Sequence, residues 1–448
     1  MPFTPHGADP TLYERPTELL QHLVRFDTTN PPGNEAACIA FINDLLTQAG
    51  LQTTILAADP ARPNLIARLK GRGEVPPLLL QGHVDVVTTE KQAWHYPPFS
   101  GTSADGYIWG RGTLDMKGTV TMMICAMLRA QAQGTSLPGD VILAVLSDEE
   151  AGGILGAQYL VEQHPQLFEG VRYALGELGG FTSYIAGHKF YPIQVLEKQM
   201  CWLRAAVHGP GGHGSMPMHG GTMAKLGYVL QRLDQQRLPV HITPIPQQMI
   251  ETIAAALPDP VGSQIRRLLD VTQTDSILDQ LDQLGPHASL FDPILHNTVN
   301  ATTVHGGEKV NVIPSEVLVE MDGRLLPGFT PDDMLRELHA LLGNEIEFTV
   351  MRYGEGRTQA DMGLYETLTT ILHEADPGGT PIPVLMPAVT DGRFFSHLGI
   401  QTYGFHPMNL PTDLNFLQSL HTANERIPIE AMEFGTQAIY EVLRRHKA

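Results

Sequence analysis

Stretches of helical periodicity alternate with short apolar runs over about the first 150 residues. Apolar side chains repeat every three or four positions in segments 16–24 and 38–46, and Gly50 is placed to end the second helix. Three runs are almost wholly apolar and lie between turn-forming residues: Leu65–Leu69, Leu78–Leu80 and Val141–Leu146. Such runs are typical of strands covered on both faces. A helix expected from about Met116 to Gln133 separates two of them, so the chain begins as an α/β domain with a parallel or mixed sheet.

The pattern changes near residue 187. From there to about residue 355 the chain carries strand-like alternation and a long polar helical stretch, in the order Cys201–Val207, Met249–Leu284, Val299–Val304 and Val317–Asp322. The α/β pattern returns after Gly356. We therefore expect an α+β domain at 188–355, inserted into a first domain that is formed by 1–187 and 356–448.

Charge and cysteine content narrow the function classes. The chain holds 48 acidic and 29 basic side chains, a net charge of −19, which argues against nucleic acid or an anionic membrane as a partner. No apolar run is long enough for a membrane-spanning helix, and Met1–Pro10 lacks the features of a signal peptide, so a cytoplasmic location is expected. The three cysteines, Cys38, Cys125 and Cys201, lie in apolar patterns and are expected to be buried rather than paired.

Acidic and histidine side chains collect at the ends of the expected strands. They are His83 and Asp85 after Leu78–Leu80, Asp115 just before a helix, Glu149 and Glu150 after Val141–Leu146, and Glu177 after Val171–Gly176. In open α/β sheets, ligands bind outside the carboxyl ends of the strands. Imidazole and carboxylate together suit a divalent cation such as zinc. One carboxylate that bridges two such ions would hold them roughly 3.5–4 Å apart.

Two local spacings suggest more specific roles. Asp85 is placed to accept the second ring proton of His83, which would fix the tautomer and raise the basicity of the ring. The adjacent side chains of Glu149 and Glu150 do not easily point the same way. One of the two is therefore expected to bind metal while the other stays free as a general base.

Six motifs carry a family resemblance across residues 15–430, approximately. They are Gly82–Val87, Gly110–Gly118, Asp148–Glu150, Gly212–Ser215, Asn311–Pro314 and His421–Arg426. In kind and order they resemble those of the acetylornithine deacetylase, succinyl-diaminopimelate desuccinylase, carboxypeptidase G and aminoacylase family of dinuclear zinc metallopeptidases. The resemblance implies a zinc-exopeptidase-like catalytic domain with a central mixed sheet, and an inserted dimerisation or lid domain.

The resemblance also assigns a metal centre. It implies two Zn²⁺ per subunit, with Co²⁺ or Mn²⁺ as substitutes: His83 and Glu177 at one ion, Glu150 and His421 at the other, and Asp115 bridging both. Glu149 would be the base that takes a proton from a zinc-activated water, and Asp85 would belong to the catalytic set. In this family's pattern the Glu177 position is often aspartate, and glutamate adds one methylene of reach.

For the inserted domain, the resemblance implies a homodimer in which His213 reaches the partner's site and stabilises the oxyanion. Asn311 and Arg324 would contact the substrate, since a guanidinium pairs bidentately with a carboxylate. The expected activity is therefore hydrolysis of an amide or peptide bond next to a free carboxylate. An N-acyl amino acid or a short peptide would be the substrate.

Simpler interpretations stay open at several positions. Asp115 could only cap a helix, Arg324 could form a surface ion pair, and His406 and His397 compete with His421 for the last ligand position. The loop Thr390–Arg393 resembles a family loop near the substrate. Alternative functions are a non-catalytic metal- or peptide-binding protein on the same fold, or a dimer that metals merely stabilise. Neither a Gly-X-Ser-X-Gly elbow nor a His-Glu-X-X-His helix occurs, which argues against serine hydrolases and thermolysin-like enzymes.

Overall fold

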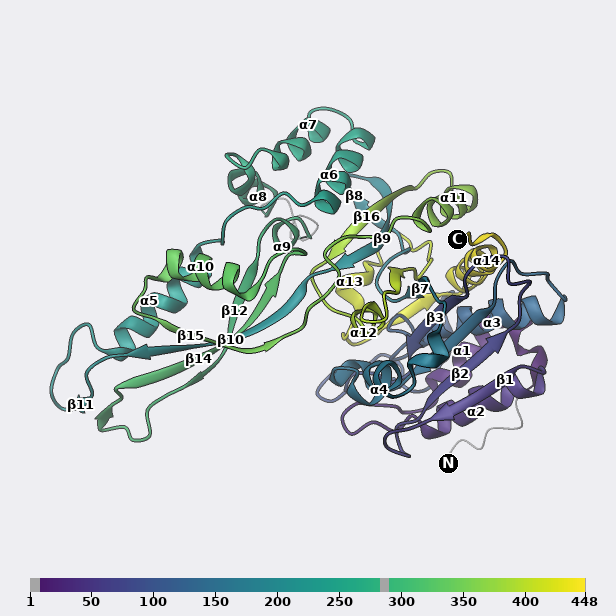
Figure 1. The fold of residues 1–448 in the computed structure, drawn as a ribbon, viewed down its shortest axis with the longest axis horizontal. Coiled ribbons are helices and arrows are strands. Elements are labelled where there is room, and N and C mark those ends of the chain that lie inside the picture. Colours follow the sequence, from purple (N-terminus) through teal and green to yellow (C-terminus); the bar gives the residue numbers. More distant parts are fainter. Residues whose placement is uncertain (1–8, 283–289, 448) are drawn as a thin grey trace. The chain divides into compact units, whose positions relative to one another are not determined.

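The computed structural model describes residues 9–282 and 290–447 and divides the chain into two compact units (Figure 1). Unit 1 comprises Met1–Val195, Ala360–Val384 and Thr390–Ala448, and unit 2 comprises Leu196–Gln359 and Leu385–Val389. Within the described ranges, no helix combines the length and the apolar character that a membrane crossing requires. Cys38, Cys125 and Cys201 are buried free thiols, as expected.

Unit 1 is built on a mixed sheet with the strand order β1-β2-β6-β3-β7-β17-β9-β16, and β8 pairs with β9 (Figure 1). The bounds are β1 Gln52–Leu56, β2 Asn64–Leu69, β3 Leu78–His83, β6 Val141–Leu146, β7 Tyr173–Gly176, β8 Ser183–Ile185, β9 His188–Glu197, β16 Thr380–Met386 and β17 Gln401–Gly404. Strands β6, β3, β7 and β17 run parallel, whereas β1–β2, β2–β6 and β17–β9 are antiparallel. A small separate sheet joins β4 (Thr102–Ala104), β5 (Tyr107–Trp109) and β18 (Arg426–Pro428). The predicted mixed sheet is confirmed.

Helices cover this sheet and bury its central strands. They are α1 Pro16–Val24, α2 Ala36–Gln48, α3 Lys117–Ala132, α4 Tyr159–Gln163, α11 Tyr365–Ala375, α12 Gly392–Ser396, α13 Phe416–Ser419 and α14 Ile429–Arg445. Helix α3 packs against α1 and α14. Leu160 of α4 and Phe395 of α12 share a core cluster with Leu79 and Ile142 of the sheet. All residues of β3 and β6 are buried, as expected for strands covered on both faces.

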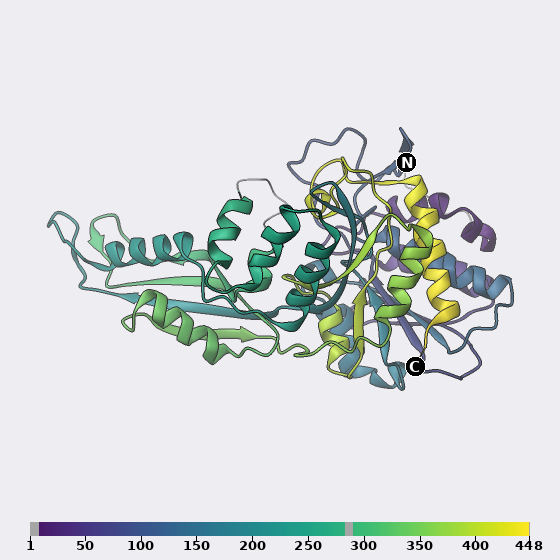
Figure 2. The same ribbon diagram turned by 90° about the horizontal axis from the view of Figure 1, so that it is seen from above.

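Unit 2 is an antiparallel sheet with the order β12-β14-β10-β15. Its strands are β10 Gln199–His208, β12 Thr298–His305, β14 Glu316–Leu325 and β15 Glu347–Tyr353, and β11 (Gly212–His213) pairs separately with β13 (Val312–Ile313). Its helices are α5 Thr222–Gln235, α6 Pro244–Ala256, α7 Val261–Arg266, α8 Thr274–Asp282, α9 Asp292–Leu295 and α10 Pro331–Leu342. Helices α5 and α10 lie along the sheet (Figure 2), and their Val229 and Leu338 pack with Leu203 and Val319 of the strands.

Most elements predicted from periodicity are confirmed, with two differences. The single helical stretch expected from Met249 to Leu284 is divided into α6, α7 and α8. Prolines at 258 and 260 separate α6 from α7, and a 3₁₀ turn at Arg267–Leu269 lies between α7 and α8. Leu284 lies outside the described residues. Strand β1 was not expected from the sequence, because it is an edge strand without a buried face. Gly50 does end α2: its φ is +85°, and its N–H bonds to the carbonyl of Thr47.

Candidate metal centre

Two of the predicted ligands lie at the carboxyl ends of neighbouring parallel strands. His83 is the last residue of β3, and Glu177 directly follows β7, which pairs with β3. Nε2 of His83 lies 3.6 Å from Oε2 of Glu177 and 3.2 Å from Oδ1 of Asp115. The strand pairing therefore brings together three side chains that are far apart in the sequence.

The carboxylate of Asp115 lies between two imidazoles. Its second oxygen, Oδ2, is 3.1 Å from Nε2 of His421, and the same nitrogen is 3.4 Å from Oε2 of Glu150. Each imidazole nitrogen thus faces two carboxylate oxygens at 3.1–3.6 Å. Ligand atoms bound 2.0–2.1 Å from one tetrahedral zinc are about 3.3 Å apart, so the donor set and its spacing fit a pair of divalent ions that share Asp115.

The electrostatics of the cluster favour cations. Burial lowers the pKa of His83, but its bonds to Asp115, Asp85 and Glu177 outweigh burial and raise that pKa well above the ordinary value. Bonds to Asp115 and Glu150 raise the pKa of His421 to about 10. Burial works against ionisation of Asp115, yet the two imidazoles hold its pKa far below the usual range. The carboxylates therefore concentrate negative charge that protons or metal ions must balance.

Glu149 lies inside this cluster rather than in a solvated turn. It begins a short 3₁₀ helix, Glu149–Ala151, and a carboxyl oxygen lies within 4.8 Å of ligand atoms of both His83 and Glu177. Burial, and then the charge of Glu177, raise the pKa of Glu149 well above its usual value. A carboxyl group with a raised pKa beside metal ligands has the properties of a general base.

Asp85 holds the turn that carries Glu149 and Glu150. Its two carboxylate oxygens accept the backbone N–H groups of these residues at 3.1 Å each, and a third bond at 2.8 Å comes from Asn30 Nδ2. Nδ1 of His83 lies 2.9 Å from the backbone carbonyl of Asp85 but 3.4 Å from its carboxylate. The ring proton that the sequence led us to expect on the carboxylate is thus directed mainly at the carbonyl.

A buried ion pair behind this turn was missed by sequence reasoning. Arg62 donates to both carboxylate oxygens of Glu35, at 2.5 and 2.7 Å, and to Asp148 at 3.2 Å. Asn30 links Asp148 to Asp85, with bonds of 3.3 and 2.8 Å. Glu149 and Glu150 therefore rest on a network that extends into the interior of unit 1.

The structure separates the competing histidines. His421 faces the carboxylates of Asp115 and Glu150, whereas His406 follows β17; neither histidine belongs to the two groups of potential metal ligands found among the described residues. His406 is buried, and within the described part of the chain neither ring nitrogen has a hydrogen-bond partner. Burial lowers its pKa to about 3, so the ring is neutral. His397 follows helix α12.

The three remaining predicted residues lie in unit 2. The β11–β13 pairing places His213 opposite Val312, and the N–H of Gly214 bonds to the carbonyl of Asn311 at 2.8 Å, so His213 and Asn311 are close neighbours. The ring of His213 is exposed, and its Nδ1 lies 2.8 Å from Ser215 Oγ. Arg324 on β14 makes two bonds to Asp322, at 2.7 and 2.9 Å, so its guanidinium already has a carboxylate partner in its own chain.

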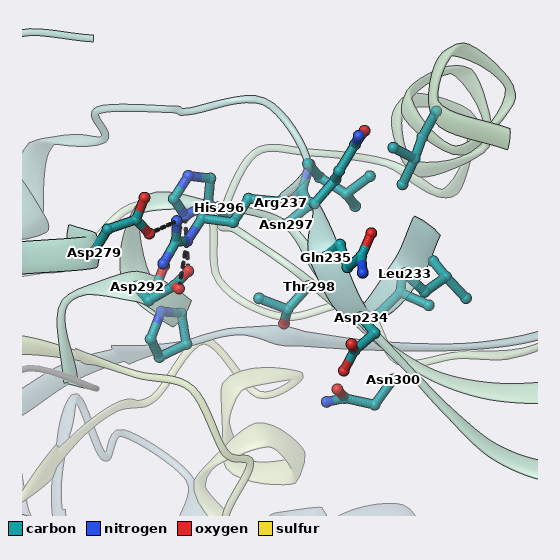
Figure 3. Close-up of a pocket in the computed structure, with 15 residues that line it drawn as sticks. Leu233, Asp234, Gln235, Arg237, Asp279, Asp292, His296, Asn297, Thr298 and Asn300 are labelled. Atoms are coloured by element: carbon teal, nitrogen blue, oxygen red, sulfur yellow. Dashed lines mark hydrogen bonds and ion pairs between the residues drawn. The ribbon is translucent and has the colours of Figure 1, made fainter. Parts of the chain in front are cut away.

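Unit 2 also contains a polar pocket of about 560 Å³, between the end of α5 and the start of β12. Arg237 donates to Asp292 at 2.6 Å and to Asp279 at 2.7 Å on its wall (Figure 3). The buried ring of His296 contacts Asp292 as well. Arg237 and His296 pair with Asp279 and Asp292, which compensates part of the acidic charge on the wall, and none of the predicted site residues lines this pocket.

Known proteins share the fold and the sequence pattern. A model of peptidase family M20/M25/M40 matches residues 79–445. N-fatty-acyl-amino acid synthase/hydrolase PM20D1 of Xenopus tropicalis is 28% identical over 381 residues, covering 82% of this chain and 72% of the relative. Aminoacylase-1 of Sus scrofa is 27% identical over 428 residues, covering 91% and 89%. The structure of the M20 family metallo-carboxypeptidase Sso-CP2 of Sulfolobus solfataricus has a similar fold, with a TM-score of 0.68 at 16% identity over 96% of this chain and 98% of that one.

Proposed function

The chain belongs to peptidase family M20/M25/M40, as its motifs predicted, and we propose that it hydrolyses the amide bond of N-acyl amino acids or short peptides next to a free carboxylate. Metal-dependent amide hydrolysis is the activity common to this family and the chain's relatives. The observation that carries the proposal is the carboxylate of Asp115 between two imidazoles, with Glu149 beside them. The relatives are named as hydrolases and aminoacylases, which argues against the non-catalytic alternative.

Five side chains would hold two zinc ions. His83 and Glu177 would hold one, His421 and Glu150 the other, and Asp115 both, in agreement with the distances between their ligand atoms. When bound, such ions supply Lewis acidity that polarises a carbonyl and lowers the pKa of water from about 15.7 towards 7.

Glu149 would accept the proton of the attacking water and return it to the departing amine. Its position beside His83 and Glu177 suits both steps, because a carboxyl group there lies next to the reacting water and can take up and release its proton. Asp85 would keep Glu149 in place through the backbone N–H bonds that it accepts. Arg62 and Glu35 would support the same turn from behind.

The choice of substrate class draws on the relatives and on unit 2. The relatives include an N-fatty-acyl-amino acid hydrolase, an aminoacylase and a metallo-carboxypeptidase. A free carboxylate on the substrate would be recognised by Arg324, which would exchange its bonds to Asp322 for bonds to the substrate, while Asn311 would contact the substrate's polar groups.

We also include a homodimer in the proposal, with His213 stabilising the oxyanion in the partner's site. The β11–β13 region that carries His213 exposes large apolar side chains, namely Met216, Met218, Val310 and Val312, together with Met223 at the start of α5. An exposed apolar patch of this kind marks protein–protein contact sites. The cytoplasmic location expected from the sequence remains part of the proposal.

The test compares wild-type protein with Glu149→Gln on a panel that varies the acyl group and the C-terminal residue separately, after loading with Zn²⁺ or Co²⁺. We expect wild-type turnover of substrates with a free carboxylate, and a loss of about 100- to 10,000-fold in kcat for the variant, with metal content unchanged. Glu162→Gln, on an exposed position of α4, is the matched control and should retain full activity. Absence of turnover on the whole panel, or equal activity of the Glu149 variant, would refute the proposal.

A further inference from the structure

The two halves of the metal centre differ in how the fold supports them. His83 ends a fully buried strand, and Glu177 directly follows another. His421, by contrast, lies outside regular structure with φ at +60°, a conformation that side-chain-bearing residues rarely adopt. Asp115 lies in the segment before α3, and Glu150 in a short turn. The half that contains His421 therefore needs support from outside its own backbone.

The buried carboxylate of Glu425 accepts hydrogen bonds from several residues of the segment that leads to Asp115. Oε1 of Glu425 accepts the backbone N–H groups of Leu114 at 2.7 Å and of Asp115 at 3.2 Å. Its Oε2 accepts hydrogen bonds from Nη1 of Arg111 at 2.6 Å and from the backbone N–H of Gly112 at 3.2 Å. One side chain thus fixes the backbone on which the bridging carboxylate is mounted.

The same arginine reaches the His421 segment. Arg111 Nη1 also lies 3.2 Å from the carbonyl of Thr422, and its Nη2 donates to Oε1 of Gln92 at 2.9 Å. Nε2 of Gln92 in turn donates to the carbonyl of His421 at 2.9 Å. Antiparallel pairing of β5 with β18 continues next to these contacts, because the N–H of Gly110 bonds to the carbonyl of Glu425.

Arg111 and Glu425 are both charged and only about 1% exposed. The proposed hydrolysis gives neither of them a role. Their burial as a charged pair is costly unless every hydrogen bond is made. Neither belongs to the groups of potential metal ligands found among the described residues. The contacts of this pair give it a structural role: they hold the segment before Asp115 next to the segment after His421, although the two are about 310 residues apart in the chain.

From this geometry we infer that Arg111 and Glu425 are positioning residues, which, with Gln92, set the metal site of Asp115, Glu150 and His421. The inference rests on the proposed function. It makes the two sites unequal: loss of the clamp formed by Arg111, Glu425 and Gln92 weakens the site of His421, whereas the site of His83 and Glu177 keeps its strand-borne ligands. Loss of a partner that orients metal ligands typically costs about 10- to 100-fold in affinity.

The experiment is a metal titration of the metal-free, full-length chain with Zn²⁺, by calorimetry with a competing chelator at constant pH. Glu425→Gln removes the charge while preserving shape. Gln92→Ala, at a half-buried position, removes the bond to the carbonyl of His421 and the bond from Arg111 Nη2, and leaves the bonds of Glu425 in place. Asp140→Asn is the matched control, because Asp140, like Glu425, accepts hydrogen bonds from an arginine side chain (Arg68) and from a backbone N–H (Gly71).

Wild type and Asp140→Asn should each bind two equivalents of Zn²⁺. The affinity for each equivalent should be the same in the two proteins. Glu425→Gln should bind the second equivalent about 10- to 100-fold more weakly. The first equivalent should weaken by less, because only Asp115 among its ligands depends on the clamp, and Gln92→Ala should change the second equivalent in the same direction. Equal binding by all four proteins, or equal weakening of both equivalents in Glu425→Gln, would overturn the clamp. If circular dichroism shows that Glu425→Gln is unfolded, Gln92→Ala decides: a weaker second equivalent supports the clamp, and unchanged binding overturns it. A wild-type protein that binds no metal would overturn the proposed function, and the clamp with it.

Discussion

Replacing Arg62 with methionine leaves two interior carboxylates, those of Glu35 and Asp148, without their shared counter-charge. The side chain of Glu35 is 0% exposed and that of Arg62 6%, so solvent cannot take over the lost bonds. Removing one partner of a buried pair costs about 3–5 kcal/mol. Methionine has a similar length, so little of this cost comes from lost volume. We therefore expect Arg62→Met to destabilise unit 1 by about 3–5 kcal/mol at neutral pH.

The pH dependence and a double variant identify the cause. Burial raises the pKa of Glu35 and the bonds from Arg62 oppose that shift, so without Arg62 this carboxyl group takes up a proton more readily. The penalty should then shrink as the pH falls, because a protonated Glu35 needs no counter-charge. Glu35→Gln combined with Arg62→Met should recover about 2 kcal/mol relative to the sum of the single variants, the coupling expected of a direct pair.

Urea denaturation followed by tryptophan fluorescence measures these effects, since Trp94 and Trp109 both lie in unit 1. Arg72→Met is the control, because Arg72 forms an ion pair with Glu74 in solvent, and such exposed pairs contribute little to stability. A loss below 1 kcal/mol for Arg62→Met, or strict additivity in the double variant, would refute the reasoning.

Three further predictions follow from the same structure. Chelation of bound metal with EDTA should lower the midpoint of thermal unfolding, because a ligand at 1,000 times its Kd raises the free energy of unfolding by about 4 kcal/mol. An unchanged midpoint in the presence of EDTA would contradict a metal-stabilised fold. Gly33→Ala should cost at least about 2 kcal/mol in a denaturation experiment, because φ is +81° and a Cβ there would lie 2.0 Å from Cζ of Arg62; full stability would show that the buried arginine is free to move. Burial lowers the pKa of His296, but the bonds to Asp292 outweigh burial and raise that pKa above 6.5. The contribution of His296 to stability is therefore complete below pH 6.5 and is lost as the pH rises through the folded-state pKa. In thermal scans His296→Gln should flatten this decline of stability with rising pH, and a pH profile identical to the wild type would exclude His296 as the cause.

Much of the fold was predictable because its signals are local. The apolar runs of β3 and β6 and the periodicity of α1 need only a few neighbouring residues to be recognised. The positions of His83 and Glu177 followed from the rule that ligands gather at the carboxyl ends of parallel strands.

The supporting contacts were not predictable, because they join segments with no shared local pattern. Glu35 and Arg62 are 27 residues apart, and Arg111 and Glu425 are 314 apart. Each of these side chains alone is indistinguishable from an ordinary surface charge. The carboxylate of Asp85 shows the same limit: its spacing from His83 predicted a bond to the ring, but the fold turned it towards the N–H groups of the 149–150 turn.

The division into units has a consequence for how such a protein can diversify. Every proposed metal ligand and Glu149 come from unit 1, whereas His213, Asn311 and Arg324 come from the inserted segment Leu196–Gln359. Exchange of that segment between relatives would replace the proposed substrate contacts of Asn311 and Arg324, together with His213, and would leave the proposed metal ligands and Glu149 in place. The proposed substrate contacts can therefore change by recombination at the two ends of one continuous segment, while the residues proposed to hold the metals stay as they are.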